Sequence, residues 1–204
     1  MALLTLNICN QYASEHYLLY NSKKSYSLCF TPKGVKFERP LFELDIVAIS
    51  IVTECRYLGI IVNQRNCDAD LKRQMRKFYA NTNILLRKFS KCSPDVKCHL
   101  FKTFCANMYC STMWYDSTKT AMSKLRIAYN NGLRRLLGIP TYNSAKEMFV
   151  ILNIPSFGEL LRKFAYSFRN RVMCSSNMYL YGICNSTVPL HSNIWSWWHD
   201  ILTL

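Results

Sequence analysis

The first 67 residues alternate between one helical pattern and short strand patterns. Residues 3–19 place apolar side chains roughly on one helical face, which predicts a helix. Short apolar or alternating runs predict strands at 26–30, 41–46 and 56–62, with polar, Pro- or Gly-containing segments between them. This part of the chain is therefore predicted to combine helix and strand.

From Asp68 onward the pattern is helical and has clear start and stop signals. The predicted helices cover about residues 68–91, 94–115, 119–137, 144–152 and 156–172, counting caps. Ser93, Ser144 and Ser156 are N-cap candidates, the last two with capping-box spacing, while Gly138 and Pro140 follow the third helix. The tail after Met173 is rich in tryptophan and is predicted to hold one short helix. The fold class is thus predicted as α+β, mainly α.

Residues 68–91 form the most informative of these helices. A narrow apolar stripe runs along it, made of Leu71, Met75, Phe78, Thr82, Leu85 and Phe89. The opposite half of the helical wheel carries the cations Lys72, Arg73, Arg76, Lys77, Arg87, Lys88 and Lys91. Only two acids, Asp68 and Asp70, accompany them, and both lie in the first turn. A solvated helix surface usually mixes both signs, so this surface is predicted to contact phosphate.

The composition is that of a folded chain. Of its 204 residues 50% are apolar and 19% are charged, which argues against intrinsic disorder. No run approaches 18 consecutive apolar residues, so no membrane span is expected. The first six residues lack a basic flank, and no secretory signal is expected there.

The net charge of +14 is concentrated in one block. Residues 68–171 carry 19 basic and 6 acidic side chains, whereas residues 1–67 carry 7 and 5. Residues 172–204 hold no Lys or Arg. A focused positive field favours a polyanionic partner, nucleic acid first and anionic membrane second. Further cations would extend the surface if the helices lie side by side, namely Lys124, Arg126, Arg134 and Arg135, and then Arg162, Lys163, Arg169 and Arg171. Backbone contacts of this kind give binding that tolerates sequence and weakens with salt.

The cysteines and histidines do not form a metal motif. None of the ten cysteines makes a C-x-x-C pair, and the four histidines are scattered along the chain. We therefore expect no metal site and interpret the cysteines as free, buried thiols of a reducing, intracellular compartment, either nucleus or cytoplasm.

Motifs for catalysis are absent from the sequence. It contains no Walker A, no G-x-S-x-G and no H-E-x-x-H motif. The closest acidic pairs, Glu43 with Asp45 and Asp68 with Asp70, are better explained by a strand and a helix start. Without a carboxylate cluster to hold Mg²⁺, nucleotidyl transfer has no chemical basis in these residues.

The order of several short segments resembles a known family. These segments are Tyr20–Ser25 followed by an apolar strand, Tyr57-Leu58-Gly59, the basic helix, Ser93–Lys97, Ala128–Asn130, Arg134–Leu137 and Ser144–Phe149. In order and spacing they resemble the C-terminal half of a non-LTR (LINE-type) retrotransposon reverse transcriptase, over about residues 3–180. The resemblance implies domains at 1–66 (a truncated palm remnant), 67–173 (a thumb-like basic helical bundle) and 174–204 (a C-terminal tail).

The resemblance also implies roles for individual positions. Asn21, Lys24 and Ser25 are similar to palm motif D, whose lysine lies near the phosphates of the incoming nucleotide. Tyr57, Leu58 and Gly59 resemble motif E, the primer grip that holds the growing strand. The helices from residue 68 onward would then be the thumb, which holds an RNA/DNA template–primer duplex.

The family's metal-binding aspartates have no counterpart in this sequence. In the family they lie in motif A and in a Y/F-A-D-D motif C, shortly before the helix equivalent to residues 3–19. The polymerases use Mg²⁺, so without these ligands the chain alone is expected to have no cofactor and no catalytic residues. The leading hypothesis is a reverse-transcriptase fragment that binds nucleic acid without extending it. The alternatives are a non-enzymatic helical module for nucleic acid or protein, and a decayed reading frame.

Overall fold

The computed structural model describes residues 2–30, 41–44, 47–186 and 193–203. It is mainly helical with a few short strands, which confirms the predicted α+β, mainly α class. Contacts divide the chain into two compact units, a first unit of Met1–Arg65 and a second unit of Asn66–Leu204. Every strand among the described residues lies in the first unit, and each unit is described by itself below.

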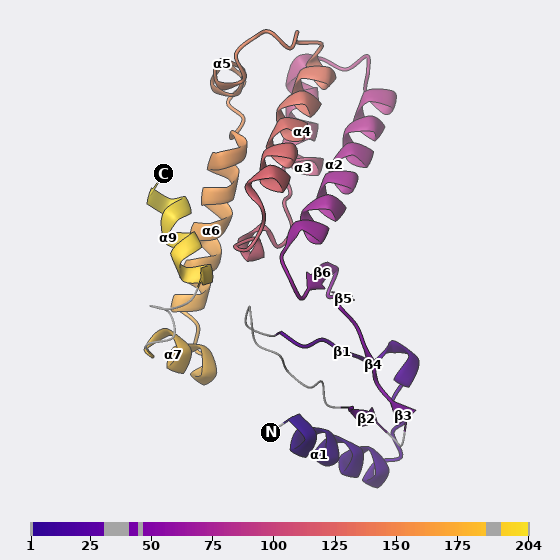
Figure 1. Cartoon of the computed structure of the whole chain (residues 1–204). Helices are drawn as coiled ribbons and strands as arrows, with labels where there is room; N and C mark the ends of the chain where they lie inside the picture. The colour runs from indigo at the N-terminus through magenta and orange to yellow at the C-terminus, as the bar shows by residue number, and fades with distance from the viewer. Residues whose placement is uncertain (1, 31–40, 45–46, 187–192, 204) are drawn as a thin grey trace. The chain divides into compact units, whose positions relative to one another are not determined.

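The first unit holds one helix and short strand pairs (Figure 1). Its helices and strands are α1 (Ala2–Glu15), the 3₁₀ turn η1 (Ser22–Lys24), β1 (Tyr26–Ser27), β2 (Glu43–Leu44), β3 (Val47–Ala48), β4 (Ser50–Ile51), β5 (Glu54–Tyr57) and β6 (Ile60–Asn63). β1 pairs parallel with β4, and β2 pairs antiparallel with β3. The helix predicted over 3–19 ends at Glu15, because Tyr17 takes the left-handed conformation with φ 53°. The strand predicted over 26–30 is only two residues long, and residues 45–46 of the 41–46 strand lie outside the described residues.

The single strand predicted over 56–62 is wrong. β5 and β6 form an antiparallel hairpin in which Tyr57 faces Ile60, so the chain reverses at Leu58-Gly59. Both turn residues have positive φ, 47° and 83°, as a tight two-residue hairpin turn requires. Glycine adopts this conformation freely, whereas a leucine side chain is strained in it.

The second unit is a helical bundle. Its helices are α2 (Asp68–Lys88), α3 (Pro94–Phe104), the 3₁₀ turn η2 (Ser111–Met113), α4 (Lys119–Leu137), α5 (Ala145–Ile151), α6 (Phe157–Met173), α7 (Met178–Cys184) and α9 (Asn193–Thr203). α4 lies between α2 and α6 (Figure 1). The helix predicted over 94–115 ends at Phe104, eleven residues early, and the chain reaches η2 instead. The one helix predicted in the tail is also corrected, since α7 and α9 both lie there.

The predicted capping residues act as the sequence indicates. The hydroxyls of Ser93, Ser144 and Ser156 each accept a hydrogen bond from the backbone N–H three residues later. At α6 the Glu159 carboxylate also accepts from the Ser156 N–H at 2.7 Å, which completes the capping box. Gly138 ends α4 in the left-handed conformation with φ 71°. These local signals explain why α3, α5 and α6 begin, and α4 ends, where the sequence predicts.

The core of the second unit is aromatic and lies where α2, α3 and α4 meet. Phe78, Phe101 and Tyr129 are at most 1% exposed, and their ring centroids lie 5.2–6.1 Å apart. The predicted stripe on α2 faces this core, since Leu71, Phe78, Thr82 and Leu85 are buried and Met75 and Phe89 pack partly against it. Gly132 of α4 lets the two helices approach closely at Phe78.

The tail returns to this bundle through α9. Trp198 is 3% exposed, and its ring packs against Phe168 of α6 with centroids 5.4 Å apart. Its indole Nε1 donates a 3.0 Å hydrogen bond to the carbonyl of Thr112 in η2. The helix α9 is therefore part of the folded second unit.

Candidate nucleic-acid interface

The outer surface of α2 carries an exposed row of cations. Lys72, Arg76, Lys77, Arg87 and Lys88 are all exposed, as is Lys91 just beyond the helix end. They form two clusters, because no cation lies between Lys77 and Arg87. These two residues are ten positions apart, or about 15 Å along the helix axis. No acidic residue occurs from position 71 to 94, so the charge of this row is not offset locally.

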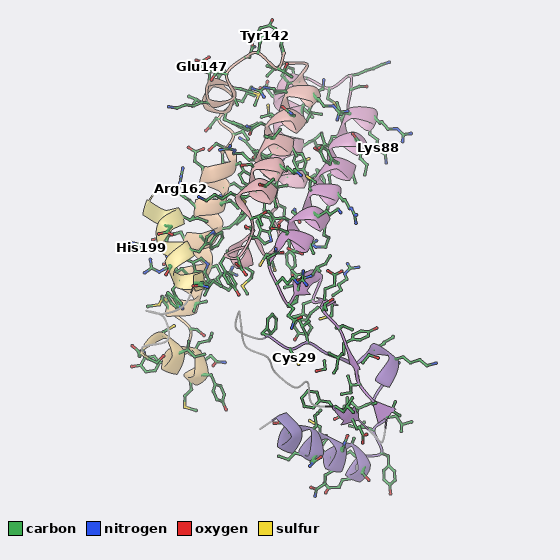
Figure 2. All side chains as sticks on the ribbon, in the orientation of Figure 1. Cys29, Lys88, Tyr142, Glu147, Arg162 and His199 are labelled. Carbon is green, nitrogen blue, oxygen red and sulfur yellow. The ribbon has the colours of Figure 1, made fainter. Side chains whose placement is uncertain are left out.

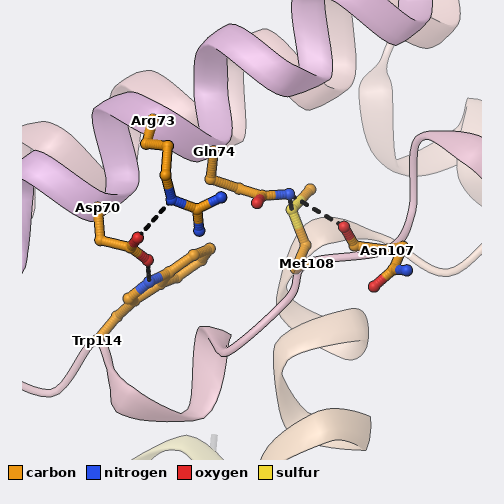
Figure 3. Close-up of polar contacts among 6 residues, drawn as sticks. All are labelled: Asp70, Arg73, Gln74, Asn107, Met108 and Trp114. Carbon is orange, nitrogen blue, oxygen red and sulfur yellow. Dashed lines mark hydrogen bonds and ion pairs between the residues drawn. The ribbon is translucent and has the colours of Figure 1, made fainter. Parts of the chain in front are cut away.

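Arg73 differs from the other predicted contacts on α2. Its Nε donates to Asp70 Oδ1 at 2.6 Å, and the other carboxylate oxygen accepts from the Trp114 indole at 2.9 Å (Figure 3). Asp70 is 3% exposed and Trp114 1%, so the ion pair lies at the edge of the core. One terminal nitrogen of Arg73 is buried without a hydrogen-bond partner in the described residues. The ion pair thus holds the Asp70 carboxylate in place for its bond to Trp114 in the segment after α3, and less of Arg73 faces solvent than the helical wheel suggests.

Next to Arg73, Gln74 fixes the same segment. Its side-chain nitrogen donates to the Asn107 carbonyl at 3.0 Å and lies 3.7 Å from the Met108 sulfur (Figure 3). At the start of α2, Asp68 accepts two 2.8 Å hydrogen bonds from Thr118, one from the backbone N–H and one from the hydroxyl. Thr118 is the N-cap of α4, so Asp68 joins the starts of the two helices. Both acids of the first turn of α2 therefore have structural partners.

Of the four predicted cations of α4, three are exposed and one is bonded to other parts of the fold. Lys124, Arg126 and Arg135 are exposed. Arg134 is half-buried, and its two terminal nitrogens donate to the Asn131 side chain at 3.2 Å and to the Asn143 carbonyl at 2.7 Å. Arg134 therefore holds the loop after α4 against the helix.

The motif-like residues of the first unit lie at two turns. The Asn21 carbonyl accepts 3.0 Å hydrogen bonds from the Lys24 N–H and from the Ser25 hydroxyl, which shapes η1 and leaves the Lys24 side chain exposed. Tyr57 and Leu58 are 62% and 73% exposed at the tip of the β5–β6 hairpin, beside Gly59. Both segments present side chains to solvent.

The prediction that the cysteines are free, buried thiols is correct only in part. All ten cysteines lie in described residues and are free, but only Cys98 and Cys105 are buried, while seven are half-buried and Cys174 is exposed. Burial raises the pKa of the Cys105 thiol to about 11, against a smaller opposite effect of its contact with Thr82. Within the residues that the structure describes, no three His, Cys, Asp or Glu side chains gather as a metal site.

A groove that the sequence pattern does not reveal lies between α4, α5 and α6. It has a volume of about 1080 Å³, and four of its lining residues are cations, namely Arg126, Lys146, Arg162 and Lys163. These residues come from three helices, and only the folded bundle brings them together. Periodicity within one helix carries no signal for such a site.

Comparison with known proteins finds one informative similarity. The chain is 25% identical over 130 residues to the RNA-directed DNA polymerase from mobile element jockey of Drosophila funebris. The match covers 61% of this chain and 14% of that polymerase, so the chain spans only a small part of its relative. No protein-family profile and no solved structure matches the sequence. The similarity indicates a region related to reverse transcriptases.

Among the described residues, none of the helices has the length and apolar character needed to cross a bilayer.

Proposed function

We propose that this chain is the end-of-palm and thumb part of a non-LTR retrotransposon reverse transcriptase and that it binds template–primer duplex through α2 and α4. The observation that carries the proposal is the row of exposed cations on α2 without acidic neighbours. The similarity to the jockey polymerase supports the family, and the order of the sequence motifs supports the assignment to this part.

The spacing of the cations suits a double helix. The two clusters of α2 stand about 15 Å apart along the helix axis. They can therefore contact phosphates at two separate positions of a duplex backbone. Lys124 and Arg135 of α4 add positive charge to the second unit. Because phosphate contacts do not read bases, binding is expected to tolerate sequence.

We further propose that these 204 residues do not polymerise on their own. Several acids already serve the fold. Asp68 binds Thr118, Asp70 binds Arg73 and Trp114, and Glu159 caps α6. Nucleotidyl transfer needs carboxylates that are grouped and available to two metal ions. In this proposal the Mg²⁺ ligands of the family belong to segments outside this sequence.

Duplex binding is tested by titrating the full chain with a fluorescent RNA–DNA hybrid of about 20 base pairs at 50 and 200 mM salt. The variant R76Q/K77Q/R87Q/K88Q removes exposed charge and keeps Arg73 with its buried partner. We expect binding to weaken at least tenfold and the salt slope to fall by roughly 3.6, about 0.9 for each lost phosphate contact. The control K97Q/K102Q removes two lysines from α3. Equal loss per removed charge in both variants, or binding that ignores salt, would refute the α2 contact.

Catalysis is tested by primer extension with Mg²⁺ and dNTPs, using the same hybrid with a recessed primer end. We expect no incorporation. Incorporation that copurifies with the chain and disappears in the K24A variant would show that the first unit is catalytic.

A further inference from the structure

We propose that the groove between α4, α5 and α6 binds a single strand of nucleic acid, separately from the duplex surface on α2. This inference rests on the proposed function, because it assigns a second site to the same nucleic-acid ligand. The groove belongs wholly to the second unit.

The charge of the groove selects an anion. Arg126, Lys146, Arg162 and Lys163 line it, against the single carboxylate of Glu159. That carboxylate accepts the Ser156 N–H at 2.7 Å in the capping box, so it is already engaged with the start of α6. The Arg162 guanidinium reaches back over Gly158, to 3.8 Å from the position that a Cβ atom would take there. Four cations from three helices therefore surround a concave surface with one engaged acid.

The remaining lining distinguishes a single strand from a duplex. Apolar side chains contribute to the groove, and Val150 is 73% exposed within it. A duplex hides the faces of its bases in the stack and offers phosphates and groove edges, whereas a single strand can lay its base faces on apolar side chains. Asn130 and Asn153 also line the groove and supply amide groups for base edges. A lining that combines apolar side chains with four cations thus fits the bases and phosphates of one strand.

The groove and the α2 surface are separate sites. α4 lies between α2 and α6, and Figures 1 and 2 show Lys88 on the α2 side of the bundle and Arg162 on the α6 side. A duplex held on the outer surface of α2 therefore leaves the groove available. A strand that extends beyond the duplex is the ligand that could occupy the second site at the same time.

The test uses the full chain and two probes, a fluorescent oligothymidine of about 12 nucleotides and the blunt RNA–DNA hybrid used above. The variant R162Q/K163Q should weaken oligothymidine binding on the order of tenfold and reduce its salt slope by roughly 1.4, about 0.7 for each lost contact. It should change hybrid binding less than twofold. The α2 variant R76Q/K77Q/R87Q/K88Q should give the opposite pattern.

A second pair of variants tests the apolar part of the groove lining without changing charge. V150S should weaken oligothymidine binding and leave hybrid binding unchanged, and Val150 is exposed enough for the fold to tolerate serine. The matched control V96S alters an exposed valine of α3 outside the groove lining and should change neither. Circular dichroism spectra identical to the parent protein establish that each variant is folded.

Three results would overturn the inference. Oligothymidine affinity that is unaffected by both groove variants would place the single strand elsewhere, while intact hybrid binding would leave the proposed function standing. Equal loss for both probes would make the groove part of the duplex surface. Displacement of oligothymidine by a polyglutamate peptide at equal concentration, lost in R162Q/K163Q, would identify an acidic peptide site instead.

Discussion

Gly132 of α4 lies directly against the ring of Phe78 of α2. A Cβ atom at Gly132 would stand 2.5 Å from the Phe78 Cζ atom and 2.7 Å from its Cε1 atom. Phe78 is 1% exposed and is held by Phe101 and Tyr129, so its ring has little room to move. The closest approach of α2 and α4 therefore depends on the missing side chain.

The first prediction follows from this contact. Gly132→Ala should lower the free energy of unfolding by about 1–3 kcal/mol, because the added methyl group overpacks the core. Gly158→Ala in α6, where a Cβ atom meets only Arg162 at 3.8 Å, should raise it by about 0.5–1 kcal/mol through helix propensity. Urea unfolding of both variants measures the difference. Adding Phe78→Leu to Gly132→Ala should recover part of the loss, and a purely additive double variant would contradict the contact.

The second prediction concerns the buried bond between Trp114 and Asp70. Trp114→Phe should destabilise the second unit by about 1–3 kcal/mol, because the buried carboxylate loses the indole donor. Trp197→Phe makes the same exchange at a half-buried site of α9 and should cost less. Urea midpoints compare the two. An equal cost would mean that the hydrogen bond contributes little beyond ring size.

The third prediction is a pH dependence at the start of α6. Hydrogen bonds from Ser156 hold the pKa of Glu159 below its ordinary value of 4.5, so the carboxylate is favoured in the folded state. Its contribution is therefore full above that ordinary pKa and is lost as pH falls through the lowered value. Glu159→Gln should reduce stability by about 0.5 kcal/mol at neutral pH, and the difference from the parent protein should disappear at an acid pH below the lowered pKa of Glu159.

Urea unfolding at the two pH values measures this effect. Glu147→Gln, which removes a carboxylate from the first turn of α5, controls for general loss of charge at a helix start. A difference at Glu159 that persists at low pH would contradict a role of the charged carboxylate.

The fourth prediction concerns the strained turn of the first unit. Leu58→Asn should stabilise the β5–β6 hairpin by about 1 kcal/mol, because asparagine tolerates the left-handed conformation far better than leucine. Slower hydrogen exchange of the Cys55 and Val62 amides, which face each other as a hydrogen-bonded pair of the hairpin, would report it. Exchange that is unchanged or faster would show that the leucine side chain contributes more than its backbone strain costs.

The sequence predicts the helices well where local signals bound them. The helix predicted over 119–137 matches α4 because Thr118 caps its start and Gly138 caps its end. The end of α3 is missed because the apolar residues after Phe104 continue a helical pattern while in fact burying Met108 and Trp114 against the bundle. Likewise, residues 56–62 resemble one strand, since leucine before Gly59 is an uncommon turn residue.

The same limit applies to the candidate site. The cations of α2 follow from helical periodicity, and five of them are exposed as that periodicity predicts. Arg73 is less exposed than this periodicity predicts. It pairs with the Asp70 carboxylate, which also accepts a hydrogen bond from Trp114, a residue distant in the sequence. The α4–α5–α6 groove depends on the packing of three helices, so its cations can be recognised as a group only in the folded chain.

The docking of α9 has a consequence for synthesis of the chain. The bond from Trp198 to the Thr112 carbonyl joins residues 86 positions apart, and α9 is the last helix of the second unit. When the ribosome has translated the chain only as far as α6, the Thr112 carbonyl in η2 therefore still lacks its hydrogen-bond donor, the Trp198 indole. The second unit is therefore completed only after α9 itself has left the exit tunnel, so its folding ends later than the synthesis of α2 to α6.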